Sequence, residues 1–155
     1  MRLLLEKGAN VNAQEEYGWT PLHWAAWNGR VDVVRSLLEN GGNVDARDVY
    51  GWTPLHWAAS NGHVDVMRLL LEKGANVNVQ EEDGKTPLYL AAHVGYVNVV
   101  RLLLEEGANV ELKARSGCSP LEHARRRYEI ERERKSGEQL AEVVSILEGW
   151  TLSAT

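Results

Sequence analysis

The sequence contains no phenylalanine and a single cysteine among its 155 residues. One cysteine excludes an internal disulfide and agrees with a reducing compartment. Because no run of about 18 apolar residues occurs, no segment is expected to span a membrane. The apolar core of residues 1–7 is too short for a secretory signal. We therefore expect a cytoplasmic protein.

Basic residues are also few. Lysine and arginine number 17 against 22 aspartates and glutamates, which gives a formal net charge of −5. A protein that binds along nucleic-acid phosphates would show a stripe of basic residues instead. The negative net charge therefore argues against nucleic acid as a partner, while a basic protein remains a candidate partner. The length and the 44% apolar content fit one ordered domain over residues 1–155.

What the sequence does contain is a seven-residue word that returns every 33 residues. Residues 20–26 and 53–59 both read Thr-Pro-Leu-His-Trp-Ala-Ala, residues 86–92 carry a close variant, and residues 119–125 carry a decayed one. A fixed period of this size indicates a stack of supersecondary units, each too small to bury its own apolar face.

Each residue of the word has a mechanical role. Thr20 can cap the free amides of a first helical turn, and the proline after it suits the first helical position. His23 and His56 stand where they can bond back across the cap, so we interpret both as structural. The buried stripe is expected at the i, i+3 and i+4 positions, which are Leu22, Ala25 and Ala26.

The repeat reads as helix, turn, helix and finger. A first helix is expected over residues 20–28, Gly29 takes the left-handed position that ends it, and a second apolar stripe begins at Val31. These signals divide the chain into an N-terminal half repeat (1–14), three full repeats (15–47, 48–80, 81–113), a capping repeat (114–150) and a frayed tail (151–155).

The two ends depart from this pattern. Residues 1–12 repeat residues 67–78 letter for letter, so the chain opens in mid-repeat with a helix that no first-type helix covers. Two explanations of this half repeat stay open: the chain is truncated there, or this end binds a partner. The chain can be natural, excised or engineered. In the last repeat we expect one lengthened helix over 119–135, a turn at Ser136-Gly137 and a partner helix over 138–147. The charged residues of 119–135 form either a solvated cap or a protrusion that contacts a partner.

The pattern Gly-x-Thr-Pro-Leu-His-x-Ala-Ala-x-x-Gly, with the closing word Gly74-Ala75-Asn76-Val77-Asn78, resembles the ankyrin repeat family over about residues 1–125. The resemblance implies an all-α fold, a right-handed α-solenoid of antiparallel helix pairs with β-hairpin-like fingers at about a right angle to them. It also implies a concave groove, lined by the first helices and the finger tips, that binds partners.

No catalytic or metal site is predicted. Equivalent residues of stacked repeats lie about 8 to 10 Å apart, so His23 and His56 cannot easily share an ion whose ligand atoms must lie about 2 Å from it. No HxxxH, CxxC or HExxH pair and no glycine-rich phosphate loop occurs, and Cys118 has no periodic base beside it. We expect neither an enzyme nor a cofactor.

The aromatic residues carry the functional prediction. The chain has six tryptophans and five tyrosines, and five of the tryptophans lie in the first half. Such side chains often anchor protein interfaces. Register places Trp24 and Trp57 as wedges between repeats. The residues expected to contact a partner are Tyr17, Trp19, Trp27, Asn28, Tyr50, Trp52, Ser60, Asn61, Asp83, Lys85 and His93.

Together these features predict a non-catalytic protein-protein interaction module with an aromatic-rich concave groove for a protein or peptide partner. Nucleic acid and membrane are not expected as partners. The alternative is a self-associating scaffold, in which residues 1–12 or the aromatic groove contact a second copy.

Overall fold

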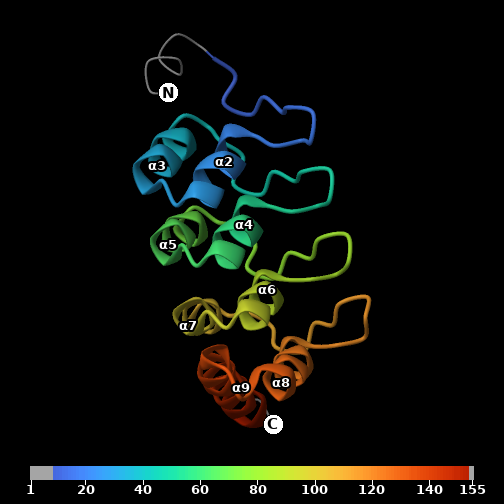
Figure 1. The fold of residues 1–155 in the computed structure, drawn as a ribbon. Helices are drawn as coiled ribbons and strands as arrows, with labels where there is room; N and C mark the ends of the chain where they lie inside the picture. Colours follow the sequence, from blue (N-terminus) through green and yellow to red (C-terminus); the bar gives the residue numbers. More distant parts are fainter. Residues whose placement is uncertain (1–8, 154–155) are drawn as a thin grey trace. The chain divides into compact units, whose positions relative to one another are not determined.

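The computed structural model describes residues 9–153, and within this range it contains eight helices and no strand. The predicted all-α class is confirmed. The helices form antiparallel pairs, and an extended finger precedes each pair along the chain (Figure 1). None of the described helices is long and apolar enough to cross a membrane. The uncovered helix expected at the N-terminus falls mainly on residues 1–8, outside the described residues.

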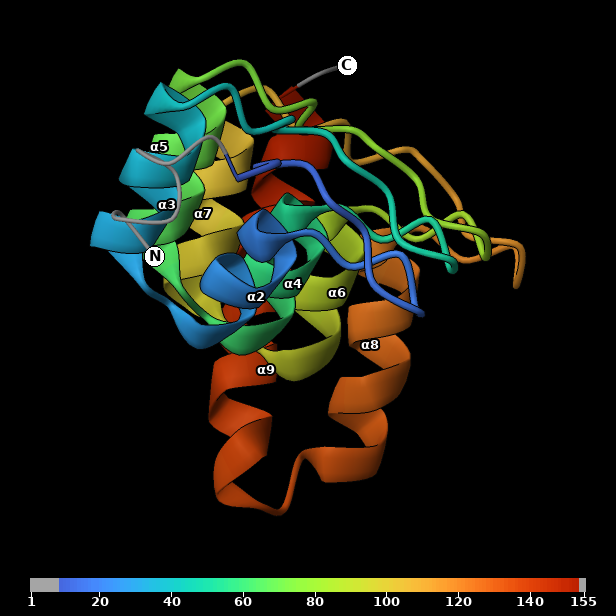
Figure 2. The same cartoon turned by 90° about the horizontal axis from the view of Figure 1, so that it is seen from above.

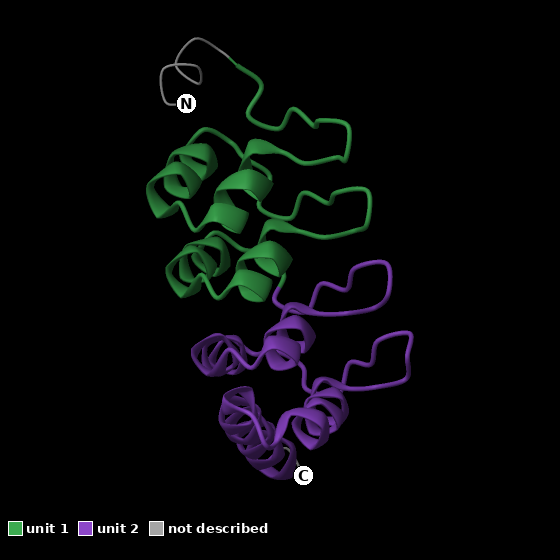
Figure 3. Ribbon diagram, viewed as in Figure 1, with its two compact units in different colours: residues 1–76 green, residues 77–155 purple. Residues whose placement is uncertain are grey.

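The chain divides into two compact units, residues 1–76 and 77–155 (Figure 3). The predicted single domain over 1–155, with its repeat boundaries, stays a prediction. Unit 1 contains α2 (Pro21–Asn28), α3 (Val31–Glu39), α4 (Pro54–Asn61) and α5 (Val64–Glu72). Within it α2 packs on α4 and α3 on α5, which gives a layer of first helices beside the fingers and a layer of second helices behind them (Figure 1).

Unit 2 contains α6 (Pro87–Val94), α7 (Val97–Glu105), α8 (Pro120–Glu131) and α9 (Lys135–Ser153). Here α6 packs on α8, and α7 on α9. The last pair is longer than the first, and its connected end extends beyond α6 (Figure 2).

The first helix of every repeat begins at a side-chain cap, as the word predicts. The hydroxyl of Thr20 accepts the backbone N–H of His23 at 3.4 Å, and His23 Nδ1 accepts the N–H of Thr20 at 3.0 Å. Thr53 and His56 form the same reciprocal capping box. Gly29 then ends α2 at φ 70°, a left-handed conformation that glycine adopts without steric cost.

The buried stripe is also confirmed. Leu22 is 1% exposed, and the side chain of Ala26 is fully buried. Val34 and Leu37 close the core from α3 with no exposed surface. The two alanines of the word leave α2 and α4 room to approach each other, and α6 packs on α8 in unit 2.

The last repeat turns earlier than predicted. α8 ends at Glu131 instead of near residue 135, and Gly137 lies in the first turn of α9, where the sequence suggested a loop. A Cβ on Gly137 would lie 2.6 Å from the carbonyl oxygen of Glu131. The glycine is therefore required for close packing of α9 against the end of α8, and not for chain reversal.

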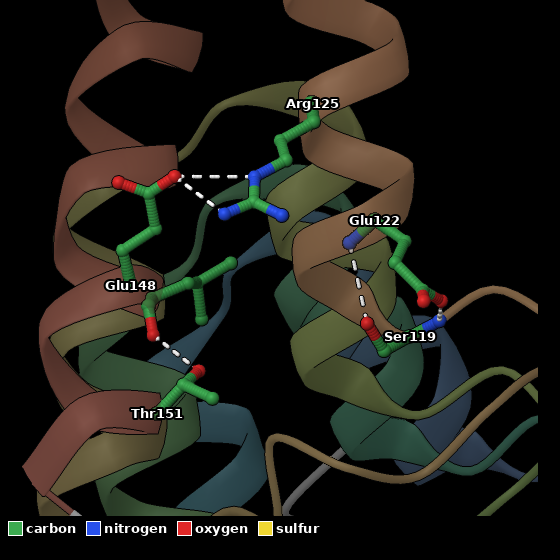
Figure 4. A network of polar contacts seen from close by, with 6 residues as sticks. Ser119, Glu122, Arg125, Glu148 and Thr151 are labelled. Carbon is green, nitrogen blue, oxygen red and sulfur yellow. Dashed lines mark hydrogen bonds and ion pairs between the residues drawn. The ribbon is translucent and has the colours of Figure 1, made fainter.

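Polar contacts fasten α8 to α9 (Figure 4). Arg125 donates to one oxygen of Glu148 from Nε at 3.1 Å and from Nη2 at 2.7 Å. The α9 helix continues to Ser153 instead of fraying near residue 150, and the hydroxyl of Thr151 donates to the carbonyl of Leu147 at 2.7 Å. Two hydrogen bonds from one guanidinium to the same carboxylate oxygen hold the two helices together more firmly than a single contact does.

Candidate protein-interaction surface

The fingers of unit 1 are tight turns stiffened by backbone hydrogen bonds. The N–H of Glu15 donates to the carbonyl of Trp19 at 3.0 Å, and Asp48 makes the equivalent bond to Trp52 at 2.9 Å. The N–H of Val49 donates to the carbonyl of Tyr17 at 3.1 Å, which joins the two fingers directly. The finger residues are therefore held in place before any partner arrives.

The Asp48 carboxylate organises the second finger. It is only 6% exposed, and its Oδ1 accepts the backbone N–H groups of Tyr50 and Trp52, each at 2.9 Å. Its Oδ2 accepts the indole N–H of Trp57 at 3.1 Å. One buried carboxylate thus couples the finger to a side chain of α4. Glu15, at the same position of the preceding repeat, is exposed and does not take this role.

Five tryptophans of unit 1, residues 19, 24, 27, 52 and 57, pack on one another, and we call them the indole cluster. The ring centroids of Trp19 lie 4.6 Å from Trp24, 5.9 Å from Trp27 and 4.8 Å from Trp57. Trp57 lies 4.4 Å from Trp52. These separations are those of favourable offset and edge-to-face aromatic pairs. Trp19 is thus the hub that links the rings of two repeats.

The exposure of the cluster differs from the prediction. Trp24 is 43% exposed, so its prediction as a wedge between repeats is wrong, while Trp57 lies half-buried between two other rings. Trp19 and Trp52, expected to contact a partner, are half-buried because neighbouring indoles cover them. Trp27 is 40% exposed, in line with a surface position. The roles of these residues in binding stay predictions.

The finger tips and helix ends complete the surface of unit 1. Tyr17 and Tyr50 are 56% and 57% exposed. Asn28 and Asn61 each donate from their side-chain amide to a backbone carbonyl one turn earlier, both at 2.8 Å, and the hydroxyl of Ser60 donates to the carbonyl of Trp57 at 3.1 Å. These three polar residues are therefore engaged with the ends of their own helices and leave the indoles as the prominent feature.

His23 is structural, as predicted. Its side chain is fully buried, and its Nε2 donates to the backbone carbonyl of Trp52 at 2.9 Å. Burial lowers the pKa of His23 below its usual value, which agrees with a neutral ring that accepts at Nδ1 and donates at Nε2. His23 therefore fixes the start of α2 and the backbone of the next finger at once.

In unit 2 the residues expected to contact a partner are polar. Asp83 is exposed at a finger tip, and its carboxylate lies 3.8 Å from the Lys85 ammonium. His93 stacks on His123 with centroids 4.9 Å apart and a nitrogen-to-nitrogen distance of 2.7 Å, and the Tyr89 hydroxyl lies 2.9 Å from the other nitrogen of His123. The three rings form one hydrogen-bonded chain that brings a predicted site residue together with two unpredicted ones.

The His123 ring titrates far from its usual range. Burial, the adjacent His93 and the nearby Arg127 lower the pKa of His123 to about 4, and burial lowers the pKa of His93 as well. His123 occupies the same repeat position as Trp24 and Trp57, so register could have flagged it, although it lies in the decayed word. Among residues 9–153 no group of three or more histidines, cysteines or carboxylates could hold a metal ion.

Comparisons with known proteins agree with this architecture. A family model described as ankyrin repeats (3 copies) matches residues 1–81, 42–114 and 74–131. The chain is 57% identical over 35 residues to ankyrin repeat domain-containing protein 49 of Mus musculus, 47% over 35 residues to protein VAPYRIN-LIKE of Medicago truncatula, and 66% over 32 residues to the 2-5A-dependent ribonuclease of Mus musculus. These segments cover 23%, 23% and 20% of the chain, and 15%, 8% and 4% of those proteins.

Proposed function

Because the chain belongs to the ankyrin-repeat family, whose repeats generally act as protein-protein interaction modules, we propose that unit 1 binds a protein or peptide through its indole cluster and finger tips. The observation that carries this proposal is the exposure of large aromatic side chains on unit 1, among which the indoles pack on one another. Trp24, Trp27, Tyr17 and Tyr50 each expose 40% or more of their surface.

The rigidity of this surface supports binding over a passive role. Trp24 and Trp27 pack against Trp19, with ring centroids 4.6 Å and 5.9 Å from its own, so a partner does not have to immobilise freely rotating rings. Ordering a free side chain on association costs about 0.5 to 1.5 kcal/mol. A surface assembled in advance avoids much of that cost.

We further propose that the module is non-catalytic and needs no cofactor. Its recognition residues lie on an open aromatic surface, and the polar side chains at the helix ends beside it, those of Asn28, Ser60 and Asn61, are bound to backbone, which suits recognition better than acid-base chemistry. In unit 2 we assign the predicted residues Asp83, Lys85 and His93 to polar contacts with a partner. The charges of Asp83 and Lys85 would add selectivity to binding and alter its rate.

Selection from a random peptide library on the intact protein tests the proposal. Peptides that bind the unmodified chain are measured again with the double variant Trp24→Ala/Trp27→Ala and with Trp150→Ala, which removes a 44%-exposed indole of α9 in the other unit. Truncation of a hot-spot tryptophan costs about 2 kcal/mol or more, so we expect affinity to fall at least about 30-fold in the double variant. The Trp150→Ala protein should bind as before.

Peptides that bind the double variant undiminished would contradict the proposal. Circular dichroism of each variant verifies that the helices remain, which Trp24 and Trp27 allow because they lie outside the core. Light scattering over a dilution series distinguishes the alternative, self-association. A dimer that dissociates only in the double variant would show that a second copy occupies the surface.

A further inference from the structure

One edge of the indole cluster borders a cavity of about 390 Å³ that opens to solvent, within the range of about 300 to 1,000 Å³ typical of ligand pockets. It lies entirely on residues of unit 1. The described residues that line it are Ala13, Gln14, Glu15, Trp19, Pro21 and Trp24.

The two indoles give this pocket aromatic walls in different directions. Trp19 and Trp24 have centroids 4.6 Å apart and planes inclined by 61°. The face of an indole carries the negative end of the ring quadrupole and attracts cations within about 6 Å of its centroid. Two inclined rings can therefore contact the same cationic head group from two sides.

The polar groups of the pocket are acceptors. The side-chain amide nitrogen of Gln14 already donates to the carbonyls of Gly18 at 3.1 Å and Arg47 at 3.2 Å, which leaves its carbonyl oxygen as the group it can offer. The backbone N–H of Glu15 is held by Trp19. The exposed carboxylate of Glu15 makes no hydrogen bond or ion pair with any residue from 9 to 153.

From these features we infer that the pocket of Trp19, Trp24 and Glu15 binds an alkylammonium head group, that of a lysine side chain, on the partner. The described lining carries a negative charge and no positive one, and the whole chain has a net charge of −5, so the complementary ligand is a cation. The inference rests on the proposed function in assigning the ligand to a partner, and it adds the chemistry that this partner presents.

The test follows the six indole N–H signals of the full chain by NMR during titration with three blocked amino acids, each an N-acetyl methylamide. They are lysine, trimethyl-lysine and the uncharged norleucine. Single Trp→Phe variants assign the signals. We expect the signals of Trp19 and Trp24 to shift saturably with both cations and not with norleucine. Tighter binding of trimethyl-lysine would indicate a methylated lysine as the natural source, and equal binding an unmodified one.

Two carboxylate variants separate charge recognition from simple apolar contact. Glu15→Gln should weaken cation binding by about 3-fold, the effect typical of one exposed ion pair. Glu16→Gln, one residue further along and outside the described lining, should not change it. Trp24→Ala should remove binding. The inference is overturned if norleucine shifts the same signals equally, or if Glu15→Gln has no effect.

The inference and the proposed function can fail separately. If library peptides lose affinity in the Trp24→Ala/Trp27→Ala variant while neither cation shifts an indole signal, the aromatic surface binds a partner and the cation pocket is refuted. If the cations bind and no peptide depends on the two tryptophans, the pocket holds and the interaction surface fails.

Discussion

Replacement of Asp48 by alanine tests how the second finger of unit 1 is held. The carboxylate accepts two backbone N–H groups at 2.9 Å and the indole N–H of Trp57 at 3.1 Å, and the residue is 6% exposed. A hydrogen bond to a charged group contributes about 1.5 to 3 kcal/mol. Because water can reach part of the finger after truncation, we expect a total loss of about 3 kcal/mol in the free energy of unfolding.

The Asp48→Asn variant refines the same test. It keeps an oxygen for the two backbone donors but turns an amide N–H₂ toward the indole N–H, so its loss should be smaller, about 1 to 2 kcal/mol. Urea unfolding, followed by tryptophan fluorescence and by far-UV circular dichroism, measures both. The fluorescence of the folded Asp48→Ala protein should also shift to longer wavelength as Trp52 and Trp57 become more hydrated.

Glu15→Ala provides the matched control, because Glu15 holds the equivalent position with an exposed carboxylate that makes no hydrogen bond or ion pair with any residue from 9 to 153. It should change the free energy of unfolding by less than about 0.5 kcal/mol. If Asp48→Ala costs no more than Glu15→Ala, the buried carboxylate does not organise the finger, and the explanation given for the positions of Trp52 and Trp57 is refuted.

Three further predictions concern the hub indole Trp19, the titration of His123 and two glycines of α9. Trp19→Ala should lower the free energy of unfolding by about 2 to 3 kcal/mol in urea titrations, because three indoles rest on this ring, whereas exposed Trp27→Ala should cost less than about 1 kcal/mol. NMR titration should give His123 a pKa of about 4. The free energy of unfolding should fall as the pH drops from 6.5 to 4, because the unfolded chain binds a proton at this histidine before the folded chain does. Solvent screening reduces the expected loss to about 1 kcal/mol. Gly137→Ala should lower the thermal midpoint through its 2.6 Å clash, with a cost of about 1 to 3 kcal/mol, whereas Gly149→Ala, with open space at its Cβ, should raise it.

The first helices were predictable because each depends on short-range chemistry. A threonine cap, a proline and a histidine at the third helical position act within four residues, so the sequence alone determines where α2 and α4 begin. The burial of Leu22 and Ala26 follows from helical spacing in the same way. Local rules of this kind do not depend on the packing of distant parts.

The last repeat was less predictable because its turn depends on contact between two helices. Ser136-Gly137 has the composition of a loop, yet Gly137 is needed where α9 approaches the carbonyl of Glu131. The serine hydroxyl donates to the Glu131 carboxylate at 3.0 Å, which further stabilises the start of α9. A glycine required for close approach and a glycine required for a turn look alike in a sequence.

The packing of the candidate site could not be predicted from the sequence. Register placed Trp19 among the residues expected to contact a partner but made Trp24 a wedge between repeats, and it could not show that the two indoles pack on each other, since this depends on rotamers. The same limit applies to His93 and His123, which lie 30 residues apart and meet only when α6 packs on α8.

The central claim is that the exposed indoles of unit 1 are where a partner binds. Cross-saturation NMR tests it most directly, with deuterated protein, a protonated peptide obtained by selection, and irradiation of the peptide alone. We predict that the indole N–H signals of Trp24 and Trp27 lose intensity while that of Trp150 is unchanged. Loss at Trp150, or at neither Trp24 nor Trp27, would contradict the claim.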